Sequence, residues 1–146
     1  MKGQNKIVNE ILLFALGISI TAAIIINFQI VHNSANDTTI YSNFNNVANT
    51  VINGITQVLN GDEGKVVVRI PDKISSEVYR IKISSDSLII SSIDNPSINI
   101  TKDLFNISSS HIIYGDVISS ARYVEIVSET TGLTKFINVK RAERYA

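Results

Sequence analysis

The sequence predicts an α+β protein in which a long, hydrophobic N-terminal helix is followed by an antiparallel, β-sandwich-like domain. Three observations predict it. Residues 11–28 form an apolar run, apolar residues recur every three or four positions over residues 30–59, and short alternating segments separated by turn residues fill residues 61–146. A chain of 146 residues suits one domain plus such a helix rather than two full domains.

The apolar run reads ILLFALGISITAAIIINF from Ile11 to Phe28, and no charged residue lies between Glu10 and Asp37. Eighteen helical residues would extend about 27 Å, close to the hydrocarbon thickness of about 30 Å of a bilayer. The run therefore predicts a transmembrane helix. The alternative is a cleaved secretory signal peptide, whose apolar region is usually about 7–15 residues and ends at a small-residue cleavage site.

Basic residues around the run predict its orientation. Lys2 and Lys6 precede it, and the next Lys or Arg is Lys65. The positive-inside rule then places the short N-terminus in the cytoplasm and the C-terminal domain outside the cell. We expect a single-pass protein of the cell membrane.

Small residues mark one face of the predicted helix. Gly17 and Thr21 are spaced as a small-xxx-small pair, and Ala22 lies beside them. Such a face lets a second helix approach closely. The alternative is a lipid-exposed face whose small residues are incidental.

Beyond the run, a single apolar stripe predicts that the helix continues. Its members are Ile40, Phe44, Val47, Val51, Ile55 and Val58 or Leu59. The stripe would cover one apolar face of the sheet. Asn60-Gly61 is the expected stop signal, and residues 33–39 (NSANDTT) are the expected place for a kink or break.

Short strands are expected in the remainder of the chain. They cover residues 65–70, 77–84, 87–93, 98–100, 112–114, 123–128 and 134–139. Two hairpins are expected, one around Ser85-Asp86 and one around residues 129–132. This pattern is typical of an antiparallel sandwich or of a strongly bent sheet.

The composition offers little for catalysis or for cofactor binding. Cysteine is absent, so the sequence excludes disulfides and thiolate chemistry. His32 and His111 are the only histidines, and neither has a partner at ligand spacing. We therefore expect no enzyme activity, no metal site and no cofactor. The formal net charge of +0 makes nucleic acid an unexpected partner.

Three N-glycosylation sequons are present, beginning at Asn36, Asn99 and Asn106. All three fall in the part of the chain expected outside the cell. A sequence this rich in Asn, Ser and Thr produces such triplets by chance, so each is weak evidence alone.

The order of parts resembles the type IV pilin superfamily, and more narrowly its archaeal branch. Met1-Lys2-Gly3-Gln4 is similar to the basic–Gly–Gln junction of one archaeal prepilin class. The resemblance implies that residues 1–3 are a leader cleaved after Gly3, with Lys2 and Gly3 recognised by a prepilin peptidase and Gln4 as the new N-terminus. The domain organisation expected is then leader 1–3, helix 4–60 and outer β domain 61–146.

The same resemblance implies assembly. Copies of the chain would wait in the membrane and then polymerise through their apolar helices, with Glu10, Gly17, Thr21 and Ala22 at the helix contacts. The first functional hypothesis is a structural subunit of an archaeal pilus-like filament used for surface attachment.

Two alternatives stay open. Glu10 followed by ILLFALG is at least as similar to pilin-like stator or accessory proteins of the archaeal swimming motor, which would link the motor to a cell-envelope or S-layer protein. The second alternative is a monomeric, membrane-tethered binding domain.

Overall fold

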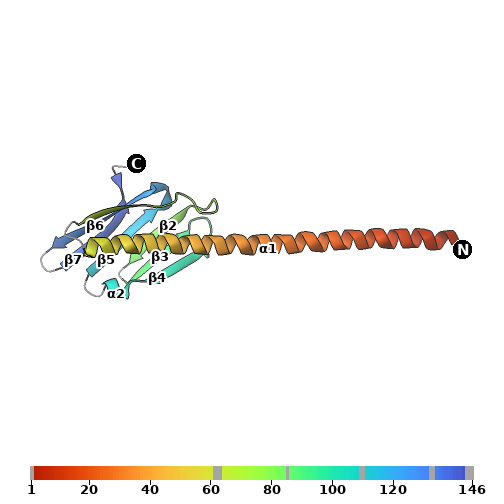
Figure 1. Cartoon of the computed structure of the whole chain (residues 1–146), viewed down its shortest axis with the longest axis horizontal. Coiled ribbons are helices and arrows are strands. Elements are labelled where there is room, and N and C mark those ends of the chain that lie inside the picture. Colours follow the sequence, from red (N-terminus) through yellow and green to blue (C-terminus); the bar gives the residue numbers. More distant parts are fainter. Residues whose placement is uncertain (1, 61–63, 85, 109–110, 132–133, 144–146) are drawn as a thin grey trace. The chain divides into compact units, whose positions relative to one another are not determined.

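The computed structural model describes residues 2–60, 64–84, 86–108, 111–131 and 134–143, with the side chains of residues 2–5, 108 and 131 left aside (Figure 1). The chain divides into two compact units, Met1–Thr38 and Thr39–Ala146. The first, the N-terminal unit, is helical; the second, the C-terminal unit, contains the end of the helix and a mostly antiparallel sheet. The predicted α+β class with a long N-terminal apolar helix is confirmed.

Helix α1 extends from Lys2 to Asn60 and is 59 residues long. It contains no break over residues 33–39, where a kink or break was expected, although the boundary between the two units falls at the end of this segment. Polar side chains here bond to the helix itself, as the Thr38 hydroxyl does by donating to the Ser34 carbonyl at 2.9 Å. Such back-bonding satisfies the hydroxyl and lets a Thr-rich segment remain helical.

The strands form one sheet. They are β1 (Lys65–Arg69), β2 (Tyr79–Ser84), β3 (Ser87–Ser92), β4 (Asn99–Asp103), β5 (His111–Ile118), β6 (Tyr123–Thr131) and β7 (Thr134–Arg141). Their order in the sheet is β1-β6-β7-β5-β2-β3-β4. All neighbours are antiparallel except β5 and β7, which are parallel. Among the described strands no second sheet forms a sandwich, because α1 supplies the other layer.

Several strand ends differ from the expected ones. The hairpin of β2 and β3 agrees with expectation, and Ser85 of its turn lies outside the described residues. In the second hairpin, β6 stays paired with β7 as far as Thr131, so the expected turn of residues 129–132 is shorter, and Gly132 lies outside the description. Strand β5 continues through Gly115 instead of ending before it. The short helix α2 (Phe105–Ser108) and the 3-10 turn η1 (Ser119–Ala121) were not expected.

The core of the C-terminal unit lies between the last third of α1 and one face of the sheet (Figure 1). The predicted stripe is buried, and its members are Ile40, Phe44, Val47, Val51, Ile55 and Val58. The Phe44 ring packs against that of Tyr79 with centroids 5.5 Å apart. The stripe therefore covers the sheet, as its spacing predicted.

The end of α1 is held by the sheet. The Lys135 ammonium donates to the carbonyls of Val58 and Leu59 at 3.5 and 3.3 Å. A cation at this end satisfies carbonyls that have no partner within the helix and complements the helix dipole.

Gly115 lies opposite Val139 in the parallel pair of β5 and β7, where a side chain would have no room. A Cβ at this position would lie 2.4 Å from the Val139 carbonyl oxygen, a backbone atom that cannot move without separating β5 from β7. We expect Gly115→Ala to lower the free energy of unfolding by at least about 1–3 kcal/mol, the usual cost of overpacking. Urea unfolding of the full chain in detergent measures it. Gly17→Ala is the control, because a Cβ there meets nothing within 4 Å, and equal stability of both variants would contradict the expectation.

Candidate functional site

The main candidate site is the exposed apolar segment of α1 between Ile7 and Val31. Its large side chains are exposed on every side of the helix; they are Ile7, Val8, Ile11, Leu12, Leu13, Phe14, Leu16, Ile18, Ile20, Ile24, Ile25, Ile26, Phe28, Ile30 and Val31. This helix is long and apolar enough to cross a membrane, and its most apolar window is wholly unburied. Water is a poor solvent for so large an apolar surface, so lipid or other protein must cover it.

A shallow apolar notch interrupts this surface at Gly17. The residues around it are Leu13, Phe14, Gly17, Ile18, Thr21, Ala22 and Ile25. The Thr21 hydroxyl donates to the Gly17 carbonyl at 2.9 Å, so the only hydroxyl in the notch is bonded within the helix. Lipid or an apolar helix can therefore cover the notch without leaving this hydroxyl unpaired. It brings Gly17, Thr21 and Ala22 together, whereas Glu10 does not line it.

The predicted processing residues Lys2, Gly3 and Gln4 lie in the first turn of α1. Met1 and the side chains of this turn lie outside the described residues.

The three sequon asparagines are all exposed, but in different settings. Asn36 lies within α1 and Asn106 within α2. Asn99, at the start of β4, uses its amide nitrogen to donate to the carbonyls of Pro96 and Ser97 at 3.0 and 3.3 Å. A glycan on that nitrogen would replace one of its two hydrogens, so modification of Asn99 must give up one of these bonds.

The two histidines lie apart from any cluster of potential ligands. The His32 ring stacks on Phe28 in α1 with centroids 6.4 Å apart, and His111 begins β5. Within the described ranges, no group of three or more His, Cys, Asp or Glu side chains could hold a metal ion.

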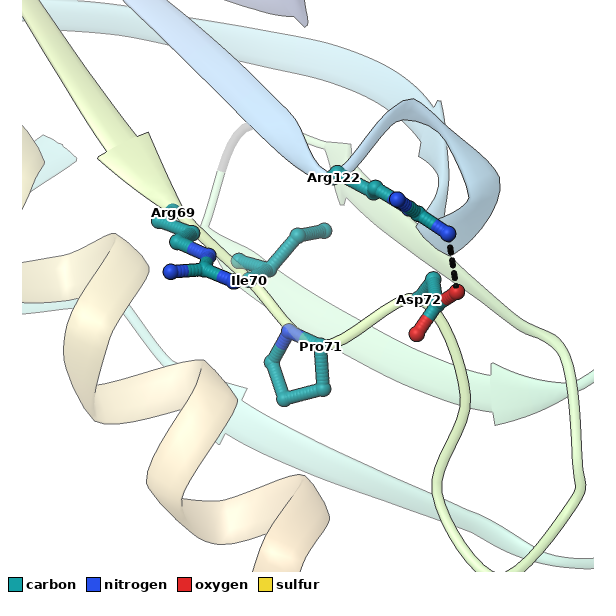
Figure 2. Close-up of a pocket in the computed structure, with 5 residues that line it drawn as sticks. All are labelled: Arg69, Ile70, Pro71, Asp72 and Arg122. Atoms are coloured by element: carbon teal, nitrogen blue, oxygen red, sulfur yellow. Dashed lines mark hydrogen bonds and ion pairs between the residues drawn. The ribbon is translucent and has the colours of Figure 1, made fainter.

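A second candidate site, which sequence reasoning missed, is a pocket just after β1. Arg69, Ile70, Pro71, Asp72 and Arg122 line it (Figure 2). The Arg122 guanidinium bonds the Asp72 carboxylate at 2.9 Å. This hydrogen bond, together with the positive charge of Arg122, holds the pKa of Asp72 below its usual value.

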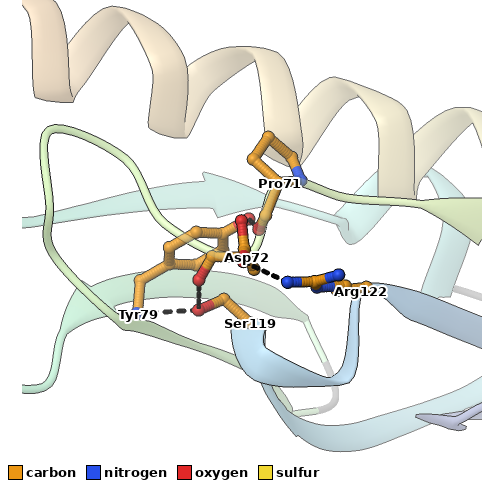
Figure 3. A network of polar contacts seen from close by, with 5 residues as sticks. All are labelled: Pro71, Asp72, Tyr79, Ser119 and Arg122. Carbon is orange, nitrogen blue, oxygen red and sulfur yellow. Dashed lines mark hydrogen bonds and ion pairs between the residues drawn. The ribbon is translucent and has the colours of Figure 1, made fainter. Parts of the chain in front are cut away.

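Backbone contacts fix the segment that carries the pocket (Figure 3). The Tyr79 hydroxyl donates to the Pro71 carbonyl at 2.6 Å, and the Ser119 hydroxyl donates to the Asp72 carbonyl at 2.7 Å. The Tyr79 backbone N–H in turn donates to the Ser119 oxygen at 3.2 Å. Burial raises the pKa of Tyr79, so its hydroxyl keeps the proton that makes this contact.

A second cluster of charge lies on the sheet. Glu125 is nearly buried, with its carboxylate 2.8 Å from the Lys65 ammonium and 3.7 Å from that of Lys140. The hydrogen bond with Lys65, aided by both positive charges, lowers the pKa of Glu125. The two cations come from β1 and β7, so Glu125 ties together three adjacent strands.

These two carboxylates predict a loss of stability in acid. Asp72 and Glu125 have folded-state pKa values below those of the unfolded chain. Their contribution is therefore complete above about pH 4–5 and disappears as pH falls through the folded values. Between pH 7 and pH 3, we expect the free energy of unfolding to decrease less in the double variant Asp72→Asn, Glu125→Gln than in the unaltered chain. Urea unfolding of the full chain at the two pH values measures this. Equal decreases would contradict the expectation.

Neither a protein-family model, a characterised protein nor a solved structure matches this chain.

Proposed function

We propose that this chain is a structural subunit of an archaeal type IV pilus-like surface filament, held in the membrane before assembly and polymerising with copies of itself through α1. The observation that carries the proposal is the exposed segment from Ile7 to Val31, whose large apolar side chains lie on every side of the helix. A helix that only covers a domain needs one apolar stripe, as the later part of α1 has. A helix apolar all round needs apolar surroundings on all sides.

Two environments meet that need in succession. In the membrane, lipid surrounds the segment, whose length and composition allow it to span the bilayer. In a filament, helices of neighbouring copies would surround it, so the apolar surface would pass from lipid to protein without exposure to water. The notch at Gly17 supports close packing between such helices, because small residues let backbones approach.

The C-terminal unit has its own core and would form the outer surface of the filament. Its expected position outside the cell rests on the positive-inside rule. Lys2 and Lys6 precede the apolar run, and no Lys or Arg follows the run until Lys65. In this arrangement Asn36, Asn99 and Asn106 would face the glycosylation machinery and the surroundings of the cell. Surface attachment is the role that suits such a filament.

Orientation can be tested because the chain has no cysteine. We expect Asp94→Cys, at an exposed site of the C-terminal unit, to react with a membrane-impermeant maleimide on intact cells. Asn9→Cys, just before the apolar run, should react only after permeabilisation. Labelling of Asn9→Cys alone on intact cells would reverse the orientation.

Filament formation is tested by deleting the gene and counting surface filaments by electron microscopy, with swimming and surface attachment measured in the same cells. The proposal expects that filaments and attachment are lost and that swimming is kept. Normal filaments with lost swimming would replace the proposal with the stator or accessory role in the swimming motor. Normal filaments with normal swimming would support the monomeric tether.

A further inference from the structure

The pocket after β1 places two arginines on either side of a short backbone segment. Arg69 and Arg122 flank Ile70 and Pro71, and Asp72 closes the far end (Figure 2). We propose that this pocket binds one acidic sugar residue, with the two guanidinium groups holding its carboxylate or sulfate. Such a site is separate from the apolar segment of α1 and from any role of that segment in assembly.

The charges in the pocket favour an anion. One guanidinium nitrogen of Arg122 contacts Asp72. The Arg122 side chain is still 66% exposed, so its other N–H donors are accessible to a ligand. The Arg69 side chain is exposed, and its guanidinium makes no hydrogen bond or ion pair within the described residues. Two cations against one carboxylate leave a net positive pocket. Guanidinium groups present planar, paired N–H donors that match carboxylate and sulfate oxygens.

The segment between the arginines is held in place before any ligand arrives. The Ile70 N–H donates to the Arg122 carbonyl at 2.8 Å. The carbonyls of Pro71 and Asp72 accept bonds from Tyr79 and Ser119, as described above. A pocket with a fixed wall loses little conformational entropy on binding, and this benefits a small ligand with few contacts.

The backbone of Arg122 adopts a φ of 58°, which is uncommon for residues other than glycine. It follows η1, and its N–H donates to the Ser119 carbonyl at 3.0 Å. A long cationic side chain at such a position costs conformational free energy that Gly would avoid. The ion pair with Asp72 and a role in the pocket together give a reason for arginine here.

The backbone around the pocket favours a compact ligand over an extended peptide. β1 is the edge strand of the sheet and ends at Arg69. Beyond it, the Ile70 N–H is already bonded and Pro71 has no N–H to donate. A peptide pairing with the edge of β1 could not continue along this segment. The exposed Pro71 ring lines the pocket and adds a small apolar surface that the C–H groups of a sugar ring could contact.

Binding is tested on the full chain in lipid nanodiscs by isothermal titration. The probes are a disaccharide ending in glucuronate, a 6-sulfated glucose disaccharide and the corresponding neutral disaccharide. The proposal expects at least one acidic probe to bind with one-to-one stoichiometry and the neutral probe to bind about tenfold more weakly or worse. Equal affinity for the neutral probe, or no binding of either acidic probe, would overturn it.

Two variants decide whether the pocket is responsible. Arg69→Gln removes an exposed guanidinium that makes no hydrogen bond or ion pair within the described residues, so the fold should be kept, and we expect the affinity for the acidic probe to fall about tenfold. Lys82→Gln removes the same charge from an exposed site on β2 outside the pocket and should leave the affinity unchanged. Equal weakening by both variants would mean nonspecific attraction and would overturn the proposal. So would tighter binding of triglutamate than of either acidic sugar.

Discussion

Replacing Phe44 with alanine should lower the free energy of unfolding of the C-terminal unit by about 3–5 kcal/mol. The Phe44 side chain is 0% exposed and packs on the ring of Tyr79, between α1 and the sheet. Its removal loses the transfer free energy of the ring and leaves a cavity that two regular elements cannot close. A domain of this size has a total stability of about 5–15 kcal/mol, so a large part would be lost. Urea unfolding of the full chain in detergent, followed by tyrosine fluorescence, measures the change.

Phe14→Ala is the matched control, since it deletes the same atoms from the same helix. Phe14 is 72% exposed and lies in the N-terminal unit. It should leave unfolding of the C-terminal unit within about 0.5 kcal/mol of the unaltered chain, as surface changes usually do. If Phe14→Ala and Phe44→Ala were equally destabilising, the division of α1 into an exposed apolar segment and a buried stripe would be wrong.

This division is the part of the fold that the sequence predicted best. A helix that is apolar on all sides has a continuous run of apolar residues, whereas a helix with one apolar face has them at every third or fourth position. Both patterns can be recognised in the sequence alone. The hairpin of β2 and β3 was also predictable, because its strands are adjacent in the chain and alternate cleanly. In both cases the residues that determine the structure are close together in the sequence.

Other features depend on partners that a local pattern does not name. Alternation predicts a strand near residue 113 but not that β5 pairs in parallel with β7. The same applies to the pocket, where Asp72 and Arg122 meet although 50 residues separate them. Asp72 was expected only as part of a segment between strands. The unbroken helix over residues 33–39 was missed for another reason: propensity disfavours Asn and Thr in helices, but their side chains can bond back to the helix itself.

The notch at Gly17 supports a prediction about assembly. Gly17→Leu should leave insertion into the membrane intact, because leucine is among the residues that favour it. It should strongly reduce or abolish surface filaments. The notch is open because Gly17 has no side chain, and leucine would fill the space that a neighbouring helix is proposed to enter. Overpacking a close contact costs about 1–3 kcal/mol, and a filament would repeat that cost in every subunit. Membrane fractionation and electron microscopy measure the two effects separately.

Ala15→Leu is the matched control for bulk. Ala15 is also exposed on α1 but does not line the notch, since two residues along a helix correspond to a rotation of about 200°. Both variants add a large apolar side chain, so lipid should accept both equally. A packing face should distinguish them, and we expect filaments with Ala15→Leu but not with Gly17→Leu. If filaments depend on the gene and yet form normally with Gly17→Leu, the helices must pack through another face of the same apolar segment.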